Sequence, residues 1–438
     1  MTLLDITPRA REDERLTALP VVVIGAGPIG LAAAAHLADR GISFVVLEAG
    51  ATIAASVRDW GHTRLFSPWK HLVDPVARRL LEATGWTLPD PERAPTGAEL
   101  VTHYLEPLAA LEAIAPHIRT GVAVTGVTRE GMDRTRSLGR ERVPFAVRTA
   151  DRGGDEISAR SVIDASGTYR TPNSLSSDGL SLRGMGEIAD AVTPALPDVL
   201  GRDRARFAGR RTTVVGAGHS AANTLLALAR LADEEPGTSV TWLIRNARAA
   251  RVTSSPDDEL ADRARLGGRV EDAVTAGRIA VIDGFEILRA RRGDSGAAVL
   301  VGRRRGEVVT HETDVVVSAT GFRPDLEPLR EVRLELDPIV EAPVRLAPLI
   351  DPNVHSCGTV EPHGFRELTH PEPGFFIVGM KSYGRAPTFL LATGYEQVRS
   401  VTAWIAGDLA SASQVELVLP ATGVCSTASG PSAAGCCS

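Results

Sequence analysis

Three glycines near the start of the chain, Gly25, Gly27 and Gly30, have the G-x-G-x-x-G spacing of a dinucleotide-binding turn. The apolar residues 21–24 before them predict a buried strand, and the alanine-rich run 31–40 after them predicts a helix. The first glycine of such a motif permits a tight turn, the second lets the backbone approach a pyrophosphate, and the third lets the helix pack closely on the strand. We therefore expect a dinucleotide here, with its phosphates at the positive end of the helix.

Two further residues belong to this predicted site. Glu48 follows a second predicted strand, residues 42–47, and stands where an acid would bind the two hydroxyls of a ribose. Pro28, between the second and third glycines, is counted as a further cofactor contact. A glycine motif alone is a weak signal, but here the strand, the helix and the acid stand where the motif requires them.

The same pattern occurs a second time in the middle of the chain. Residues 211–215 predict a strand, a glycine turn follows with alanine in the third position, and a helix is expected to run on through residues 222–231. The residues of this turn that we expect to contact a cofactor are Gly216, Gly218, His219, Ser220 and Ala221.

Arginines, rather than an acid, follow the second strand of this repeat. That strand is predicted at residues 240–244, and Arg245, Arg248 and Arg251 come directly after it. A basic cluster at this position suits a 2′-phosphate, whereas Glu48 suits a free 2′-hydroxyl. The alternative is a solvated arginine face. We therefore predict two different dinucleotides on one chain.

Two turns of small residues are expected to pass near a hinge between these units. A strand predicted at 157–163 leads into the turn of Gly167, and the strand at 315–317 leads into a similar turn at Thr320 and Gly321. We expect these three turn residues to contact a cofactor as well. Between them, residues 174–201 are rich in glycine, serine and proline and predict a connection with little regular structure.

A late strand, residues 374–378, ends at Gly379, and a helix is expected from Pro387 or Thr388 to Ala406. Its N-terminus could point at an electron-rich ring. Two tryptophans, Trp60 and Trp69, are concentrated in one loop although only 4% of the chain is aromatic. They predict either a wall around a flat cofactor ring or simple anchoring of the loop in the core.

Length and charge limit the kinds of protein that this chain can be. Its 438 residues predict two or three domains. The net charge of −6 argues against nucleic acid as the main partner. No apolar run approaches the roughly 20 residues that cross a bilayer, and the first residues show no secretory signal. We expect a cytoplasmic protein that binds neither nucleic acid nor membranes.

The two glycine units, the turn at 319–321 and the late glycine-then-helix segment together resemble the two-dinucleotide-binding-domain flavoproteins over residues 20–410. The resemblance implies an α/β fold of two Rossmann-like domains, with the NADPH-binding domain inserted in the FAD-binding domain. FAD would lie on Gly25, Gly27, Gly30 and Glu48, and NADPH on Gly216, Gly218, Ala221 and Arg245, with the region of Gly379 closing over the flavin.

The implied division of the chain has five parts. They are an N-terminal extension (1–19), a first part of the FAD-binding domain (20–180), a linker with the NADPH-binding domain (181–322), a second part of the FAD-binding domain (323–412) and a cysteine-containing flexible tail (413–438).

The positions of the cysteines distinguish between branches of this superfamily. All four, Cys357, Cys425, Cys436 and Cys437, follow residue 356, so a dithiol relay embedded in the two domains before that point is excluded by composition. The chain instead resembles the class B flavin monooxygenases, whose second hinge motif is similar to residues 320–324. It lacks the histidine of their F-x-G-x-x-x-H motif, which argues against typical Baeyer–Villiger or N-hydroxylation substrates.

Three segments, 60–70, 355–360 and 380–387, resemble more closely the flavin monooxygenases associated with arsenic resistance. Soft thiolates suit soft ions, and Cys425, Cys436 and Cys437 in the tail could hold trivalent arsenic. The alternative is exposed thiols without a catalytic role.

We therefore expect an NADPH-dependent FAD monooxygenase that uses O2 and a C4a-(hydro)peroxyflavin to oxygenate a small, soft nucleophile such as trivalent arsenic. The candidate catalytic residues are Trp69, Lys70, Cys357, Lys381 and Arg385. One alternative is a flavin-dependent NADPH reductase of a disulfide, a quinone or a thiophilic metal with a C-terminal cysteine shuttle. Another is a non-catalytic redox or metalloid-binding flavoprotein.

Overall fold

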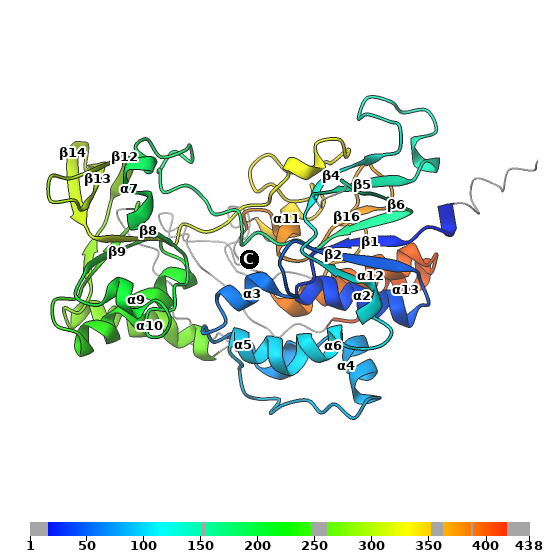
Figure 1. Cartoon of the computed structure of the whole chain (residues 1–438), viewed down its shortest axis with the longest axis horizontal. Helices are drawn as coiled ribbons and strands as arrows, with labels where there is room; N and C mark the ends of the chain where they lie inside the picture. Colours follow the sequence, from blue (N-terminus) through cyan, green and yellow to red (C-terminus); the bar gives the residue numbers. More distant parts are fainter. Residues whose placement is uncertain (1–15, 151–153, 247–260, 352–361, 387–388, 418–438) are drawn as a thin grey trace, which may run out of the picture.

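The computed structural model describes residues 16–150, 154–246, 261–351, 362–386 and 389–417, which form two lobes (Figure 1). One lobe contains the first glycine unit and the last part of the chain, and the other contains the second glycine unit. Two segments of the chain, residues 171–173 and residues 320–323, lie side by side between the lobes. Pro172 and Phe322 form an antiparallel bridge there. The second lobe is therefore an insertion in the first, as the sequence predicts.

The first lobe is built on a parallel sheet in the order β16-β7-β1-β2-β3. Its strands are β1 (Val21–Ile24), β2 (Phe44–Glu48), β3 (Ile118–Thr120), β7 (Ser161–Asp164) and β16 (Phe375–Ile377). Every residue of β1, β2, β7 and β16 is buried, because both faces of the sheet are covered. Val21 pairs with Phe44 on one side and with Ser161 on the other.

Helices cover one face of this sheet and a small antiparallel sheet covers the other. The helical side consists of α2 (Pro28–Asp39), α4 (Pro75–Glu82), α5 (Gly97–Leu100), α6 (Glu106–Ala109) and α12 (Leu391–Ile405). The opposite side consists of β4 (Val124–Arg129), β5 (Phe145–Thr149) and β6 (Glu156–Ala159). The prediction of a single strand over residues 157–163 is wrong. Residues 156–159 form β6 in the antiparallel sheet and residues 161–164 form β7 in the parallel sheet. Arg160 lies between the two strands, where its amide donates to Pro20 O.

The second lobe repeats this plan. Its parallel sheet has the order β11-β10-β9-β15-β8. Its strands are β8 (Val192–Pro194), β9 (Arg211–Val215), β10 (Ser239–Leu243), β11 (Ala280–Ile282) and β15 (Val315–Ser318). The helices α9 (His219–Glu234) and α10 (Ala261–Thr275) pack on one face. The antiparallel sheet of β12 (Phe285–Arg292), β13 (Ala298–Arg304) and β14 (Glu307–Thr313) packs on the other.

The shorter elements include α3 (Ala55–Asp59), α7 (Met185–Ile188), α8 (Arg204–Phe207), α11 (Ala347–Ile350) and α13 (Leu409–Ser413).

Two predicted boundaries differ from the structure. The connection over residues 174–201 contains α7 and β8, and β8 adds an edge strand to the second sheet. The last long helix begins at Leu391, not at residue 387 or 388, because Leu390 is still extended with φ −114° and ψ 143°.

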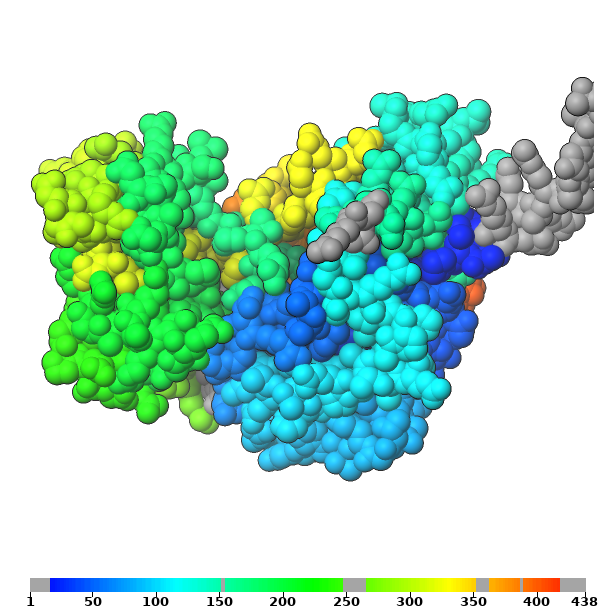
Figure 2. Space-filling model, viewed as in Figure 1, coloured from blue at the N-terminus to red at the C-terminus, as the bar shows by residue number. Residues whose placement is uncertain are grey.

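The lobes also touch through side chains. Phe66, from the loop after β2, packs against the core of the second lobe, and its ring lies 5.2 Å from that of His219 at the first turn of α9. Figure 2 shows the surface of the second lobe, in green, meeting the blue surface of the first lobe. The first turn of α9 therefore faces the other lobe.

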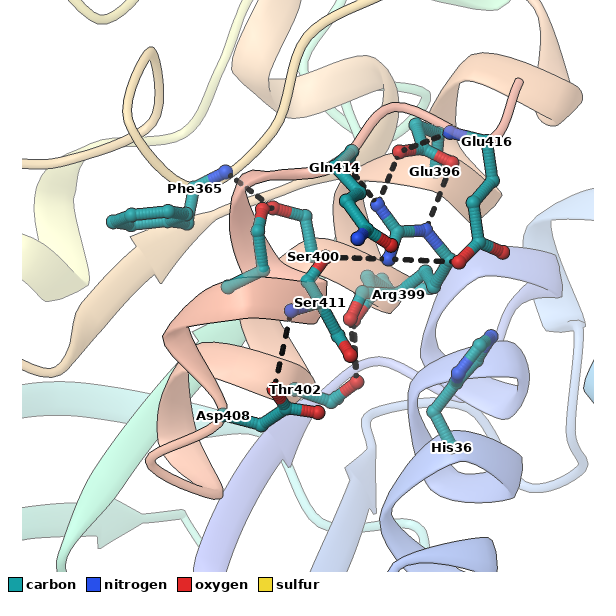
Figure 3. A network of polar contacts seen from close by, with 12 residues as sticks. His36, Phe365, Glu396, Arg399, Ser400, Thr402, Asp408, Ser411, Gln414 and Glu416 are labelled. Atoms are coloured by element: carbon teal, nitrogen blue, oxygen red, sulfur yellow. Dashed lines mark hydrogen bonds and ion pairs between the residues drawn. The ribbon is translucent and has the colours of Figure 1, made fainter. Parts of the chain in front are cut away.

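A polar network holds the end of the described chain against α12 (Figure 3). Arg399 pairs with Glu396 and donates to Ser411 O at 2.9 Å and to Gln414 O. Ser400 Oγ donates to Ala412 O at 2.7 Å. Residues 408–416 thus run antiparallel to α12, back toward its N-terminal end.

A second buried network ties β16 to the antiparallel sheet. The Glu372 carboxylate, whose side chain is 0% exposed, accepts from Arg129 Nε and from Arg140 Nε, each at 2.8 Å. Arg129 also donates to Val143 O and Pro373 O. Because Glu372 and Pro373 lead directly into β16, this cluster sets where that strand enters the sheet.

We expect Glu372→Gln to lower the free energy of unfolding by about 3–5 kcal/mol, because it leaves two buried guanidinium groups without their shared carboxylate. Urea unfolding followed by circular dichroism measures the change. Glu156→Gln is the control, since Glu156 pairs with Arg148 on the surface and exposed pairs contribute little. Equal effects of the two substitutions would contradict the structural role of the cluster.

Candidate functional site

The first glycine of each unit packs directly on the neighbouring strand. Gly25 has φ +97°, and a Cβ there would lie 2.8 Å from Ala165 O. Gly216 has φ +128°, and a Cβ there would lie 2.1 Å from Ala319 O. Both positions therefore require glycine on two grounds, the left-handed backbone and the lack of space.

The second glycine of each unit faces open space. A Cβ on Gly27 or on Gly218 would meet no atom within 4 Å, and each residue is the N-terminal cap of a long helix, without a side-chain capping bond. The free N–H groups and the positive end of each helix thus face a gap beside the backbone, which fits a pyrophosphate.

The third position differs between the two units. A Cβ on Gly30 would lie 1.9 Å from Gly25 O, so α2 approaches its strand more closely than a side chain permits. In the second unit Ala221 fills this position and is fully buried. Both units thus have the tight turn, the open helix N-terminus and the close helix packing that a dinucleotide site needs. Pro28 lies in the first turn of α2.

The Glu48 carboxylate is fixed at the edge of the first glycine turn. Its Oε2 accepts from Ala26 N and its Oε1 accepts from Gly50 N, both at 2.8 Å. Each carboxylate oxygen has more than one lone pair, so the group can accept ribose hydroxyls while the backbone holds it. This arrangement fits the adenosine ribose of FAD.

The polar residues of the second unit lie around the first turn of α9. His219 packs against Phe66, and Ser220 is partly exposed. Arg245 follows β10, and its Nη1 donates to Ser177 O at 3.1 Å. Arg245 therefore lies at the end of the strand where a 2′-phosphate is expected.

Turns of both units meet between the lobes. Thr320 Oγ1 donates to Asn173 O at 2.8 Å, and the Asn173 side-chain amide donates to Thr320 O at 3.1 Å. Gly321 and Gly167 both have positive φ, +88° and +72°. These reciprocal bonds join the two chain crossings between the lobes, and a hinge at this place stays a prediction.

The aromatic loop after β2 does not present one continuous surface. Trp69 is fully buried in the core of the first lobe, and its Nε1 has no hydrogen-bond partner among the described residues. Trp60 is only partly buried and packs on Gly97. Lys70 is exposed and pairs with Glu92 at 2.7 Å. The burial of Trp69 agrees with the predicted anchoring of the loop in the core. Lys70 forms an ion pair at the surface instead.

The turn after β16 is buried beside the first glycine unit. Gly379 has φ +68°, and a Cβ there would lie 3.0 Å from Ile29. Its amide donates to Gln397 Oε1 at 2.7 Å. Lys381 is buried and paired with Asp164, whereas Arg385 is exposed. Burial raises the pKa of Tyr383, in the same turn, well above its ordinary value.

Sequence reasoning did not select Asp164 and Gln397 as site residues. Asp164 could have been selected, because it is a charged residue at the end of a strand that is otherwise apolar. Gln397 gave none, since its partners are distant in the sequence. Six predicted site residues, Arg248, Cys357, Thr388, Cys425, Cys436 and Cys437, lie outside the described residues.

Two features are absent from the described residues. No three His, Cys, Asp or Glu side chains of this part of the chain are arranged to hold a metal ion. Among the same residues, no helix combines the length and the apolar character needed to cross a bilayer.

Comparison with known proteins identifies the family. Residues 22–345 match the family described as pyridine nucleotide-disulphide oxidoreductase, and the chain belongs to it. It is thus a flavin oxidoreductase, and the cofactors of this class are FAD and NADPH. The fold class predicted from the sequence is confirmed.

Individual relatives differ in their named activities. Indole-3-pyruvate monooxygenase YUCCA1 of Oryza sativa is 30% identical over 238 residues, which are 54% of this chain and 50% of that protein. The match thus spans only half of the rice protein. Ferredoxin–NADP reductase of Granulibacter bethesdensis is 26% identical over 76% of this chain and 78% of its own length.

Two solved structures illustrate the shared fold. Bacillithiol disulfide reductase from Bacillus cereus has a TM-score of 0.65 at 21% identity, covering 89% of this chain and 99% of its own. A flavin-containing monooxygenase from Stenotrophomonas maltophilia has a TM-score of 0.57 at 23% identity, covering 88% and 99%. Proteins named as a reductase and as a monooxygenase therefore share this architecture.

The open positions at the second glycines allow the two cofactor sites to be tested separately. We expect Gly27→Ala to weaken FAD binding by about tenfold or more, because its Cβ fills the gap beside the phosphates. Thermal unfolding of the cofactor-free protein should change little, since that Cβ meets no protein atom. Flavin fluorescence titration measures the affinity.

Gly218→Ala is the matched control and should weaken NADPH binding while leaving FAD binding unchanged. If either variant weakened both cofactors equally, or neither, the assignment of one dinucleotide to each glycine unit would be wrong.

Proposed function

We propose that this chain is an NADPH-dependent FAD monooxygenase that transfers one oxygen atom from O2 to a small, soft nucleophile, with trivalent arsenic as the specific candidate. The observation that carries the proposal is the position of the cysteines. None occurs in residues 1–356, which include both glycine units. A thiol pair in those units therefore cannot take up electrons from the flavin, which favours an acceptor that diffuses in.

Some of the named relatives support an oxygenating activity, while others are named reductases. The rice relative is named a monooxygenase, and so is the structural neighbour from Stenotrophomonas maltophilia. The segments 60–70 and 380–387 add the resemblance to arsenic-associated monooxygenases, on which the choice of arsenic rests. The cytoplasm remains our proposal for where the protein acts.

FAD, when bound, supplies hydride acceptance and oxygen activation. The chain's own residues bind and orient both cofactors. In the proposed arrangement Gly25, Gly27 and Glu48 hold FAD, and Gly218 and Arg245 hold NADPH. The contact of Phe66 with His219 brings the first turn of α9 against the FAD-binding lobe, which would help to exclude water from the space between the cofactors.

A reductase with a C-terminal cysteine shuttle is the second candidate. One observation favours it: residues 408–416 are held antiparallel to α12 and run toward its N-terminal end. The chain that follows carries Cys425, Cys436 and Cys437. In the first candidate these thiols would bind trivalent arsenic, and in the second they would pass electrons from the flavin to a disulfide, a quinone or a thiophilic metal.

Arg245→Ser tests the nucleotide preference. We expect KM for NADPH to rise by about tenfold, because a charge-assisted contact with the 2′-phosphate is lost. KM for NADH should stay the same, since NADH has no such phosphate. Steady-state kinetics with both nucleotides measure the two constants. Equal changes for NADPH and NADH would mean that Arg245 does not read the 2′-phosphate.

Substrate screening distinguishes the two candidates. We expect trivalent inorganic or organic arsenicals, rather than amines, sulfides or ketones, to stimulate NADPH oxidation with equal consumption of O2. Parallel recordings of nucleotide absorbance and dissolved oxygen measure this. Oxidation of NADPH by a disulfide, a quinone or a thiophilic metal ion in the absence of O2 would instead identify a reductase.

The variant with Cys425, Cys436 and Cys437 all changed to Ser provides the control. A shuttle requires these thiols, so a reductase should lose turnover. A monooxygenase should keep its maximal rate, with at most a higher KM for the arsenical.

A further inference from the structure

One buried ion pair joins the two parts of the FAD-binding lobe. Lys381 Nζ lies 2.7 Å from Asp164 Oδ2 and 3.1 Å from Ser166 Oγ, and the Lys381 side chain is 3% exposed. Ser166 Oγ also donates to Asp164 Oδ1 at 2.6 Å. An ammonium group has three N–H donors. Within the described part of the chain, only two of these donors have acceptors.

The position of the pair relates it to one half of FAD. Along the sheet, β2 ends at Glu48, β1 leads to Gly27, β7 ends at Asp164, and β16 leads to Lys381. Ligands of such sheets lie across the carboxyl ends of the strands. If the adenosine ribose lies at Glu48 and the phosphates at Gly27, the flavin half extends toward Asp164 and Lys381.

The surrounding backbone leaves this ion pair little freedom. Ala165 N donates to Ile24 O, and Val378 N donates to Asp164 O, both at 2.9 Å. The strand ends of β1, β7 and β16 are thereby locked together. The alignment of these strand ends fixes the position of the Asp164 carboxylate, and the carboxylate in turn fixes the position of the Lys381 ammonium group.

The choice of lysine is itself unusual in this chain. Only two of its 48 lysine and arginine residues are lysines, and the other one, Lys70, is exposed. Lysine carries a compact charge on a flexible stem, whereas the guanidinium group of arginine is broad and planar. A small buried cation with one donor to spare therefore distinguishes position 381 from the other basic positions.

We propose that Lys381 is a positioning residue for the flavin half of FAD: its third N–H donates to an oxygen or nitrogen acceptor there, and its charge raises the reduction potential of the bound flavin. Reduction by hydride adds negative charge to the flavin, and a nearby buried cation stabilises that charge. Asp164 partly offsets the cation and, with Ser166, fixes its direction. The proposal rests on FAD binding and not on the identity of the oxygenated substrate.

Two substitutions with opposite expected effects test this proposal. Lys381→Met removes the cation and leaves Asp164, so the reduction potential should fall. Asp164→Asn leaves the cation without its counter-charge, so the potential should rise. Each shift should correspond to at least a tenfold change in the ratio of the dissociation constants of reduced and oxidised FAD, about 30 mV for a two-electron couple. Reductive titration against reference dyes measures the potential.

Arg399→Met is the matched control, because it breaks another buried ion pair in the same lobe, that of Arg399 with Glu396 (Figure 3). It should lower the thermal stability of the cofactor-free protein without shifting the potential. If Lys381→Met and Asp164→Asn shifted the potential in the same direction, or no more than Arg399→Met does, the pair would have only a structural role and the proposal would be overturned.

The double variant Lys381→Met with Asp164→Asn carries the test if neither single variant folds, since it contains no unpaired buried charge. It should bind oxidised FAD at least tenfold more weakly than the wild type, because the third donor is lost. An unchanged FAD affinity would overturn the proposal.

Discussion

The close approach of a glycine to the carbonyl group of a neighbouring strand is the constraint on which both nucleotide units depend. Gly25 packs on Ala165 and Gly216 packs on Ala319, in each case with a backbone conformation that side chains disfavour. This contact allows the helix that follows to begin at the carboxyl edge of the sheet, with its free N–H groups exposed. The approached carbonyl belongs in both units to the alanine that directly follows the neighbouring strand, β7 or β15.

The insertion of one unit in the other creates a second requirement, which long-range contacts satisfy. The chain leaves the first sheet after β7 and returns to it only at β16, so the returning strand has to be held by groups that precede the insertion. Arg129 binds Glu372 across 243 positions of sequence, and Asp164 binds Lys381 across 217. The FAD-binding lobe is therefore completed only when its last part has docked. The two chain crossings beside Asn173 and Thr320 then form the narrow connection between the lobes.

The sequence predicted the parts of this structure that depend on local patterns. Both glycine motifs and the strands and helices around them follow from residue types at fixed spacing, and the insertion follows from the family resemblance; the fold class predicted in this way is confirmed. The break at Arg160 and the edge strand β8 were missed, because pairing with distant segments decides them. The small antiparallel sheets, in the same way, are defined by partners and not by their own periodicity.

Among the candidate site residues, the glycine positions could be predicted and the charged ones only in part. Lys381 was selected without its partner, since nothing near it in the sequence indicates Asp164. Trp69 was selected as an aromatic residue of a concentrated loop, but its burial depends on the whole core of the first lobe. The roles of all these residues stay predictions until cofactor-bound variants are measured.

The fate of isotopically labelled O2 distinguishes a monooxygenase from an oxidase or a reductase. The enzyme, with FAD and NADPH, would be supplied with labelled O2 and a trivalent arsenical, and the product would be analysed by mass spectrometry. We expect one labelled oxygen atom in each product molecule and one NADPH oxidised for each O2 consumed. Product without label, or label recovered only as hydrogen peroxide, would contradict a monooxygenase.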